Sequence, residues 1–230
     1  MKANSPKPPG YESKSSDYFE QARSEMLQFV PATCKRVLDV GCGKGNFGEL
    51  LKQSRPIEVW GIEPVATAAA EATTKLDHVI EGMFTPEADL PMESFDAIFF
   101  NDVLEHVYDP AAALKFALKL LRPGGIVIAS IPNIRHLPIL WALVFKGRWD
   151  YTEWGILDKT HLRFFTKKNI VELFADSGFK VEQIDGINPN LGGSSKKWFA
   201  FNFINRLTFS AIEDMRFLQF AVVARPLKDV

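Results

Sequence analysis

The stretch VLDVGCGKGNFG, residues 37–48, decides the fold, because three closely spaced glycines join a short apolar strand to the start of a helix. Glycine at such a turn lets the backbone approach a ligand closely, and the helix N-terminus offers unpaired N–H groups. Residues 43–48 also match GxGxxG, which is typical of nicotinamide dinucleotide sites. However, this match begins two residues after the strand ends at Gly41, and the acidic Asp39 stands at the strand end. The turn is therefore better suited to a ligand that carries an ammonium group.

On both sides of this turn the chain alternates short apolar strands with helices. Strands are expected at residues 36–41, 58–64, 78–82, 95–101, 125–133, 180–187 and 217–226, and helices at 18–30, 46–54, 67–75, 110–121, 167–178 and 198–214. Such alternation predicts an α/β fold with a doubly wound, mostly parallel seven-stranded sheet. A sheet of this kind binds ligands beyond the carboxyl ends of its strands.

The length and composition predict one domain. The 230 residues, 47% of them hydrophobic, can bury a single substantial core. The Pro-, Ser- and Lys-rich residues 1–16 lack the apolar stretch of a signal peptide and are expected to form a flexible tail before a domain at 17–230. Inside this domain the alternation breaks over about residues 134–166, where we expect a lid insertion on the ligand face.

Several classes of partner are disfavoured by composition. With 27 basic and 28 acidic residues and no basic stripe, the chain is not expected to bind nucleic acid. Only Cys34 and Cys42 are present, which indicates a reducing compartment, and we expect a cytoplasmic protein. The longest apolar run, residues 137–145, is shorter than the roughly 20 residues that span a bilayer. We expect a short helix there that packs inward, with peripheral contact to a membrane or a lipid-linked acceptor as the alternative.

Four motifs in order resemble those of class I S-adenosylmethionine-dependent methyltransferases. They are DVGCGKG at 39–45, Glu63 at the end of a strand, FDAIFFNDVLEH at 95–106 and LRPGG at 121–125, and the resemblance extends over residues 18–226. It implies the Rossmann-like methyltransferase fold and S-adenosylmethionine as the cofactor. In this family the residues corresponding to Asp39, Gly41 and Gly43 surround the methionine part of the cofactor, and Glu63, followed by Pro64, holds the ribose.

The resemblance implies further cofactor contacts at the ends of the third and fourth strands. Gly82 and Met83 fall beside the adenine, although the family's usual Asp is missing there. Near the sulfonium we expect three consecutive residues, which are Asn101, Asp102 and Val103. From the N-terminal helix, Tyr18 and Arg23 are expected to cover the site, with Arg23 either on the cofactor carboxylate or on a solvated helix face.

A candidate acid/base cluster follows the fourth strand. Asp102, Glu105 and His106 are spaced i, i+3, i+4, so one helical turn would place them on one face. Their pattern resembles the one that ubiquinone-biosynthesis O-methyltransferases are thought to use around a divalent cation. We assign no metal ligand and expect His106 to act as an acid/base group; the alternative is that it caps the turn.

A second candidate group lies in the predicted lid. The sequence LDKTHLRFFT at 157–166 resembles a signature of methyltransferases associated with bacterial glycan and lipopolysaccharide biosynthesis. It implies that His161 faces the acceptor and that Asp158 orients its ring or binds a substrate hydroxyl. Arg163 is expected to form an ion pair with Asp158, with binding of an acceptor carboxylate or phosphate as the alternative. Thr166 is expected to cap the next helix. His136, at the end of the fifth strand, is expected at the same rim.

Together these features predict a methyltransferase that methylates a hydroxyl of a small molecule or glycan precursor. A group with a pKa near neutrality, such as His, would remove the hydroxyl proton. Two alternatives stay open: methylation of nitrogen or carbon on another metabolite, and a cofactor-binding partner subunit without catalysis.

Overall fold

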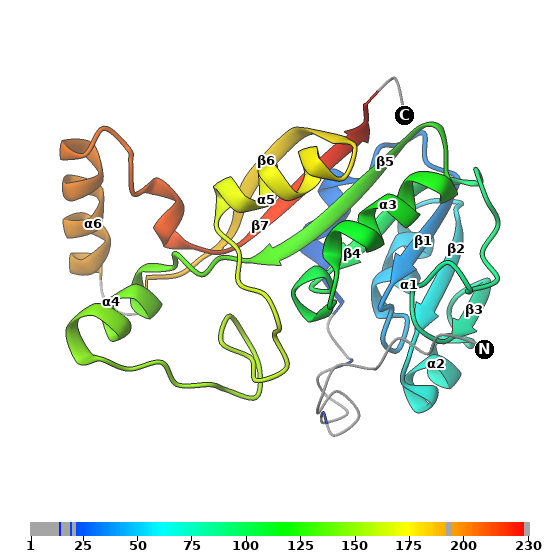
Figure 1. Ribbon diagram of the computed structural model, residues 1–230, viewed down its shortest axis with the longest axis horizontal. Coiled ribbons are helices and arrows are strands. Elements are labelled where there is room, and N and C mark those ends of the chain that lie inside the picture. Colours follow the sequence, from blue (N-terminus) through cyan, green and yellow to red (C-terminus); the bar gives the residue numbers. More distant parts are fainter. Residues whose placement is uncertain (1–13, 15–18, 20–21, 192–194, 228–230) are drawn as a thin grey trace.

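The computed structural model describes residue 14, residue 19, residues 22–191 and residues 195–227. In chain order its elements are η3 (Ser24–Phe29), β1 (Arg36–Val40), α1 (Asn46–Ser54), β2 (Glu58–Glu63), α2 (Ala66–Ala72), β3 (His78–Glu81), β4 (Phe95–Asn101), η4 (Leu104–His106), α3 (Pro110–Leu120), β5 (Leu121–Pro132), α4 (Leu137–Lys146), α5 (Lys167–Asp176), β6 (Phe179–Pro189), α6 (Ser195–Leu207), η5 (Glu213–Arg216) and β7 (Phe217–Pro226). The elements labelled η are 3-10 helices. Figure 1 shows the strands as one sheet, with the helices along the chain.

The sheet has seven strands in the order β3-β2-β1-β4-β5-β7-β6. The five strands from β3 to β5 run parallel, and β7 is antiparallel to both of its neighbours. The order reverses between β1 and β4, and this is where doubly wound sheets bind ligands. The predicted fold class is therefore confirmed.

Helices cover both faces of the sheet, as the strand pattern requires. Alternate residues of β1 point to opposite faces. Leu38 and Val40 join the apolar cluster that includes side chains of α3 and α5, whereas Val37 joins the cluster of η3, α1 and α2. Apolar burial on both faces explains why the central strands are almost continuously hydrophobic.

The strand register places the polar strand ends at one edge. Val40 pairs with Phe100, so Gly41 and Asn101 follow at the same level, and Asn101 pairs with Ser130 of β5. The next residue, Asp102, has a left-handed backbone with φ 54° and donates its N–H to the Ser130 carbonyl oxygen at 3.1 Å.

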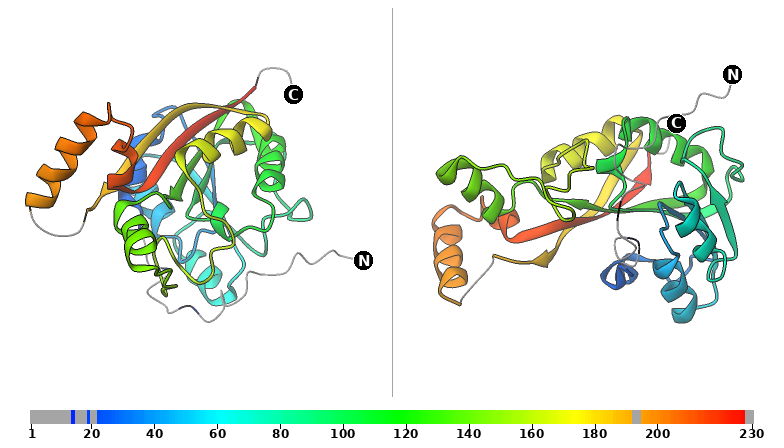
Figure 2. Two further views of the ribbon diagram at one scale, coloured as in Figure 1. Left: turned by 60° about the vertical axis from the view of Figure 1, so that its left-hand side comes forward. Right: turned by 90° about the horizontal axis from the view of Figure 1, so that it is seen from below.

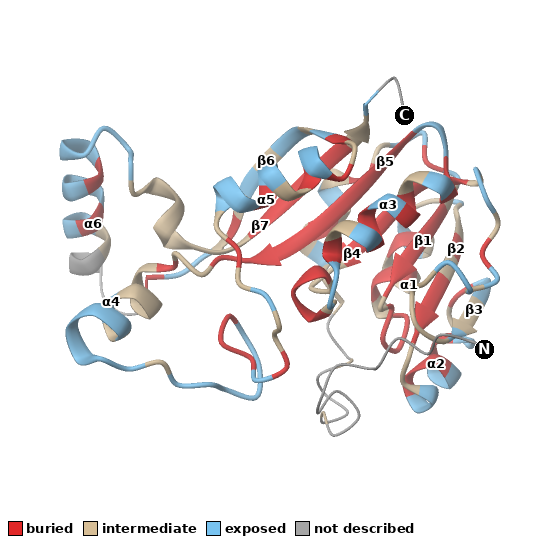
Figure 3. Cartoon of the chain, viewed as in Figure 1, coloured by how far each residue is buried: buried red, intermediate tan, exposed pale blue. Residues whose placement is uncertain are grey.

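Two helices project beyond the sheet. In Figures 1 and 2, α4 and α6 lie at the same end of the molecule, away from the helices that cover the sheet. The prediction that residues 137–145 pack inward is wrong, because α4 has no buried residue. This helix follows the carboxyl end of β5 and projects beyond the sheet, and Figure 3 shows α4 without buried positions. Among the described residues, no helix is long and apolar enough to cross a membrane.

The N-terminal helix predicted at 18–30 is shorter than expected. Its described part is η3, a 3-10 helix that begins at Ser24, because the preceding residue, Arg23, has a left-handed φ of 48°. The helix predicted at 198–214 similarly ends at Leu207. Of the tail predicted at 1–16, only Lys14 lies among the described residues.

Candidate functional site

The glycine turn after β1 has left-handed backbone conformations that favour glycine. Gly41 and Gly43 have φ values of 67° and 54°, in the left-handed region that other L-residues avoid. A Cβ atom at Gly41 would lie 2.9 Å from a methyl group of Val103, and one at Gly43 would lie 3.1 Å from the Phe19 carbonyl oxygen. The turn is thus packed closely between the β4 end and the N-terminal segment.

Two cavities meet at this turn, with volumes of about 700 and 310 Å³. Both are lined by Gly41, Asp102 and His106. The larger is also lined by the predicted cofactor residues Arg23, Asp39, Gly43 and Asn101, and the smaller by Pro64, Gly82, Met83 and Val103. The predicted cofactor positions from four strand ends therefore surround one continuous region. Tyr18 lies outside the described residues.

Glu63 lines neither cavity and braces the glycine turn instead. Its side chain is fully buried, and its two oxygens accept hydrogen bonds from the backbone N–H groups of Gly43, at 2.9 Å, and Val65, at 3.0 Å. Burial, and then the nearby charge of Glu63, raise the pKa of the Asp39 carboxyl to about 8. An ammonium group in the cavity would favour the ionised form of Asp39.

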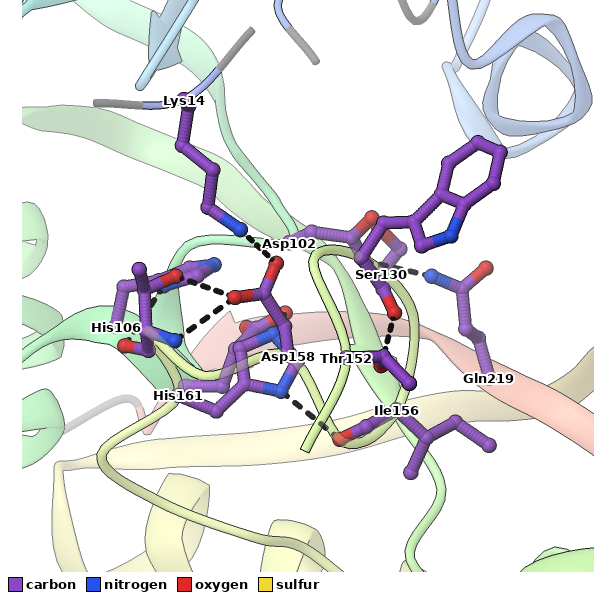
Figure 4. A network of polar contacts seen from close by, with 12 residues as sticks. Lys14, Asp102, His106, Ser130, Thr152, Ile156, Asp158, His161 and Gln219 are labelled. Carbon is purple, nitrogen blue, oxygen red and sulfur yellow. Dashed lines mark hydrogen bonds and ion pairs between the residues drawn. The ribbon is translucent and has the colours of Figure 1, made fainter. Parts of the chain in front are cut away.

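Asp102 and Arg23 form part of the cavity wall. The Asp102 carboxylate forms an ion pair with Arg23 and accepts hydrogen bonds from Ser130 at 3.1 Å and Gln219 at 2.8 Å. Arg23 also donates to the Gln219 side chain at 2.9 Å, so it does not lie on a solvated helix face. Figure 4 shows Asp102 facing Ser130 and Gln219, away from the His106 and His161 rings.

Glu105 is a buried acidic group that lines the larger cavity. Its side chain is 1% exposed, and neither of its carboxyl oxygens has an ordinary hydrogen-bond partner among the described residues. The nearest ring nitrogen, His161 Nε2, lies 3.9 Å from Oε1. Burial raises the pKa of Glu105 to about 8, so this carboxyl titrates close to neutral pH. Sequence reasoning placed Glu105 in the cluster but did not assign it a catalytic role; its spacing from Asp102 and His106 was the available signal.

The two histidines beside Glu105 are neutral hydrogen-bonding groups. His106 Nδ1 lies 3.2 Å from the Thr160 carbonyl oxygen, and His161 Nδ1 lies 3.0 Å from the Ile156 carbonyl oxygen. Each contact suits a protonated Nδ1, which leaves Nε2 as the acceptor nitrogen. Burial and the neighbouring His161 lower the pKa of His106 to about 3, and burial lowers that of His161.

Asp158 lies beside these rings but does not pair with Arg163, so that prediction is wrong. Its carboxylate pairs with Lys14 and accepts hydrogen bonds from the Thr160 N–H and hydroxyl, each at 2.8 Å (Figure 4). Burial alone would raise the pKa of Asp158, but these hydrogen bonds and the Lys14 charge lower it. Arg163 is exposed and donates to the Tyr108 carbonyl oxygen at 2.9 Å.

Backbone contacts hold the segment of the second motif over the fourth strand end. The Glu105 carbonyl oxygen accepts hydrogen bonds from the N–H groups of Leu162 and Arg163, at 2.8 and 3.1 Å. The Thr166 hydroxyl accepts from the Asn169 N–H, so the predicted helix cap is confirmed. Residues 154–161 thereby close one side of the larger cavity.

His136 is buried in a different place from the other candidate residues. Its Nε2 atom contacts the Asn190 carbonyl oxygen, and His136 lines neither of the two cavities. It joins the end of β5 to the loop after β6.

Glu105, His106 and His161 also have the geometry of a cation site. One ligand atom from each lies within 4.8 Å of the others, and all three residues are buried. One carboxylate and two imidazoles form a donor set that divalent metals accept. The sequence predicted that Asp102, Glu105 and His106 share one face. In the structure Glu105 and His106 lie together with His161, whereas the Asp102 carboxylate binds Arg23, Ser130 and Gln219.

Known proteins share both the sequence and the fold. A family model described as a methyltransferase domain matches residues 14–184. Ubiquinone biosynthesis O-methyltransferases are similar: that of Psychrobacter arcticus is 32% identical over 183 residues, covering 73% of this chain and 67% of its own. That of Aliivibrio fischeri is 35% identical over 171 residues, covering 68% of each chain.

Solved structures give the same fold at lower identity. A SAM-dependent methyltransferase from Archaeoglobus fulgidus superposes with a TM-score of 0.64 at 18% identity, covering 94% of this chain and 96% of its own. The [4+2]-cyclase SpnF superposes with a TM-score of 0.59 at 18% identity, covering 92% and 80%. Because a cyclase shares the fold, assignment to a family rests on the sequence matches and the strand-end residues. On that basis the chain belongs to the methyltransferase domain family and is a class I S-adenosylmethionine-dependent methyltransferase related to the ubiquinone-biosynthesis O-methyltransferases.

Proposed function

We propose that this enzyme methylates a hydroxyl group of a small molecule, and that Glu105 accepts the hydroxyl proton. The observation that carries this proposal is the Glu105 carboxyl, buried in the larger cavity without an ordinary hydrogen-bond partner among the described residues. A buried carboxyl without a partner is costly unless a ligand completes it. A hydroxyl acceptor would donate the missing hydrogen bond.

The cofactor residues fit S-adenosylmethionine. Asp39 offers a buried carboxylate for the ammonium group, and both polar atoms of the Asn101 side chain are buried without partners among the described residues. The smaller, mostly apolar cavity beside Gly82 and Met83 suits the adenine, and Glu63, which lines neither cavity, would hold the glycine turn in place beside the ribose. Bound there, the cofactor supplies a methyl group on a positively charged sulfur. Arg23 would exchange its Asp102 partner for the cofactor carboxylate.

The chain's own contribution to the reaction is positioning and proton removal. His161 Nε2, an acceptor nitrogen, and the Glu105 carboxylate would both face the acceptor hydroxyl, which loses its proton as the oxygen gains the methyl group. A carboxyl with a pKa near 8 is a well-matched base near neutral pH, whereas His106, with a pKa near 3, is too weakly basic. We assign His106 and Asp158 to holding Thr160 and the loop in place.

The acceptor class is a phenol or a sugar hydroxyl. The relatives are named for ubiquinone biosynthesis, which favours an aromatic hydroxyl. The DKTHLRFFT motif favours a glycan precursor, and Trp154, 73% exposed at the cavity, would stack on either ring. Cys34 and Cys42 are both free, which supports a reducing compartment such as the cytoplasm.

The same residues would hold a divalent cation if one binds. Glu105, His106 and His161 would be its ligands, and it would polarise the acceptor oxygen. Treatment with a chelator separates the two forms of the proposal: activity that survives chelation leaves Glu105 as a base, and activity restored by added metal makes Glu105 a ligand.

Product analysis tests the proposal. The enzyme, S-adenosylmethionine and a panel of phenols and nucleotide sugars should give S-adenosylhomocysteine and an O-methylated product. Glu105→Gln should lose roughly 10²-fold or more in turnover while it binds the cofactor normally. A methyl group on nitrogen or carbon would support the alternative enzyme class. Cofactor binding without any turnover, in cell extract as well as with the panel, would support a non-catalytic partner subunit.

A further inference from the structure

Lys14 contacts the wall of the larger cavity from a distant part of the chain. Its side chain is 3% exposed and forms an ion pair with Asp158, whose side chain is 1% exposed. The Lys14 ammonium also donates to the Glu153 carbonyl oxygen. Figure 4 shows the Lys14 side chain directed at the Asp158 carboxylate. Both partners belong to residues 152–161, which we call the motif loop.

The motif loop has little anchoring in the apolar core. Residues 152–155 are exposed. Ile156 and Leu157 are buried, but in the described chain they belong to neither of the two apolar clusters that pack on the sheet. The position of the loop therefore depends largely on polar contacts, and the Lys14 pair is one that joins two buried charges.

A chain of contacts leads from Asp158 to the side chains that would face the acceptor. Its carboxylate accepts hydrogen bonds from the N–H and the hydroxyl of Thr160, each at 2.8 Å. Its carbonyl oxygen accepts from the His161 N–H at 3.0 Å. The His161 ring contacts the Ile156 carbonyl oxygen, also at 3.0 Å and inside the same loop. The position of His161 Nε2, 3.9 Å from Glu105, is therefore set by the position of the loop.

Loss of the Lys14 ammonium would leave the Asp158 carboxylate buried without a compensating charge. Removal of one partner of a buried ion pair is strongly unfavourable, because the remaining charge is kept away from water. The motif loop can relieve this cost by moving outward, since residues 152–155 are already exposed. Such a movement would take Trp154 and His161, which line the larger cavity, away from their places.

We propose that Lys14 is a positioning residue of the acceptor site: it holds the motif loop, with Trp154 and His161, in the position that binds the acceptor. This inference rests on the proposed function, because it requires the acceptor to lie at His161. The residues expected to bind the cofactor belong to other segments, since Asp39 lies in β1 and Gly43 in the glycine turn. Lys14 should therefore affect the acceptor and not the cofactor.

Hydrogen exchange of the motif loop, followed by mass spectrometry, tests the proposal without an acceptor. Lys14→Met keeps a long side chain and removes its charge. The amides of residues 152–162 should then exchange roughly tenfold faster or more, because the loop opens more often. Lys159→Met is the matched control: Lys159 pairs with Glu153 at 2.7 Å in the same loop, but its side chain is 46% exposed, and exchange should stay at the wild-type rate.

Unchanged exchange in Lys14→Met would overturn the proposal, and so would an equal increase in the control. A double-mutant cycle shows whether Lys14 acts through the charge of Asp158. In an Asp158→Asn background, Lys14→Met should change the exchange little, because no buried carboxylate is left to compensate. Full additivity of the two changes would overturn the assignment.

Steady-state kinetics separate a positioning residue from a purely structural one. With the phenol or nucleotide sugar that gives the fastest turnover, Lys14→Met should raise the acceptor KM and lower kcat/KM roughly tenfold or more. Its calorimetric affinity for S-adenosylmethionine should equal that of the wild type. An equal loss of cofactor affinity would mean that Lys14 supports the fold as a whole, and would overturn the proposal.

The exchange experiment also keeps this inference distinct from the proposed base. Full turnover in Glu105→Gln would contradict the proposed function alone. Faster exchange of the motif loop in Lys14→Met, with wild-type exchange in Lys159→Met, would still support the role of Lys14 in holding the loop.

Discussion

Replacing Glu105 by Gln should change how the stability of the protein depends on pH. Burial raises the pKa of this carboxyl from 4.5 to about 8. Between these values the folded chain keeps a proton that the unfolded chain releases, so the free energy of unfolding falls as pH rises. Glutamine has nearly the same shape and cannot ionise, so the variant lacks this dependence.

The size of the effect follows from the linkage between protons and folding. Each pH unit between the two pKa values is worth up to about 1.4 kcal/mol. From pH 5 to pH 7.5 the wild type should therefore lose up to about 3 kcal/mol of stability relative to the Gln variant. Asp39, whose pKa is also raised to about 8, is present in both proteins, so its contribution cancels in the comparison.

Urea unfolding at several pH values, followed by circular dichroism, measures this difference. At each pH the free energy of unfolding of the variant is subtracted from that of the wild type, and the change of this difference with pH is the result. A constant effect of the new amide on stability cancels in this comparison. Glu172→Gln, at an exposed position of α5, is the control and should keep the wild-type pH profile. Parallel profiles for the wild type and Glu105→Gln would refute the reasoning, since they would mean that Glu105 is already ionised in the folded protein.

Three further outcomes are expected. In the wild type the affinity for S-adenosylmethionine should rise several-fold from pH 6.5 to 7.5, because the Asp39 pKa of about 8 limits the ionised fraction of this carboxyl. Calorimetry should show that the affinity of Asp39→Asn does not rise over this range. The same rise in the variant would contradict the assignment of Asp39 to the ammonium group. Gly41→Ala should lower the free energy of unfolding by about 1–3 kcal/mol in urea unfolding and weaken cofactor binding. The reason is that Gly41 has φ 67° and that a Val103 methyl group would lie 2.9 Å from the new Cβ. Wild-type stability and affinity in this variant would contradict the packing of the turn. His161→Ala should lose turnover with little change in melting temperature, and His136→Ala should do the reverse because it lies outside both cavities; the opposite pattern would exchange their roles.

The sheet and the edge at which the cavities lie were predictable from sequence because they depend on local patterns. Apolar runs at strand length, alternating with helices, determine the doubly wound order. The glycine turn and the polar strand ends then fall at one edge by topology alone, and the cavities are lined by Asp39, Gly41, Asp102 and their neighbours as expected.

The errors came from contacts between residues far apart in sequence. Asp158 pairs with Lys14, 144 positions away, so the nearby Arg163 was the wrong partner. The apolar run of α4 was expected inside because it is hydrophobic, but hydrophobic sequence shows only that a surface avoids water, not what covers it. Glu105 became the central carboxyl only once the fold brought His161 to it.

The measurement that tests the account most directly is the fate of a labelled methyl group. S-adenosylmethionine with a ¹³C-methyl group is incubated with the enzyme and its best acceptor, and the product is analysed by NMR and mass spectrometry. The account predicts the label on an oxygen, one S-adenosylhomocysteine per product, and loss of both products in Glu105→Gln although the cofactor still binds. Label on nitrogen or carbon, or wild-type turnover in Glu105→Gln, would contradict it.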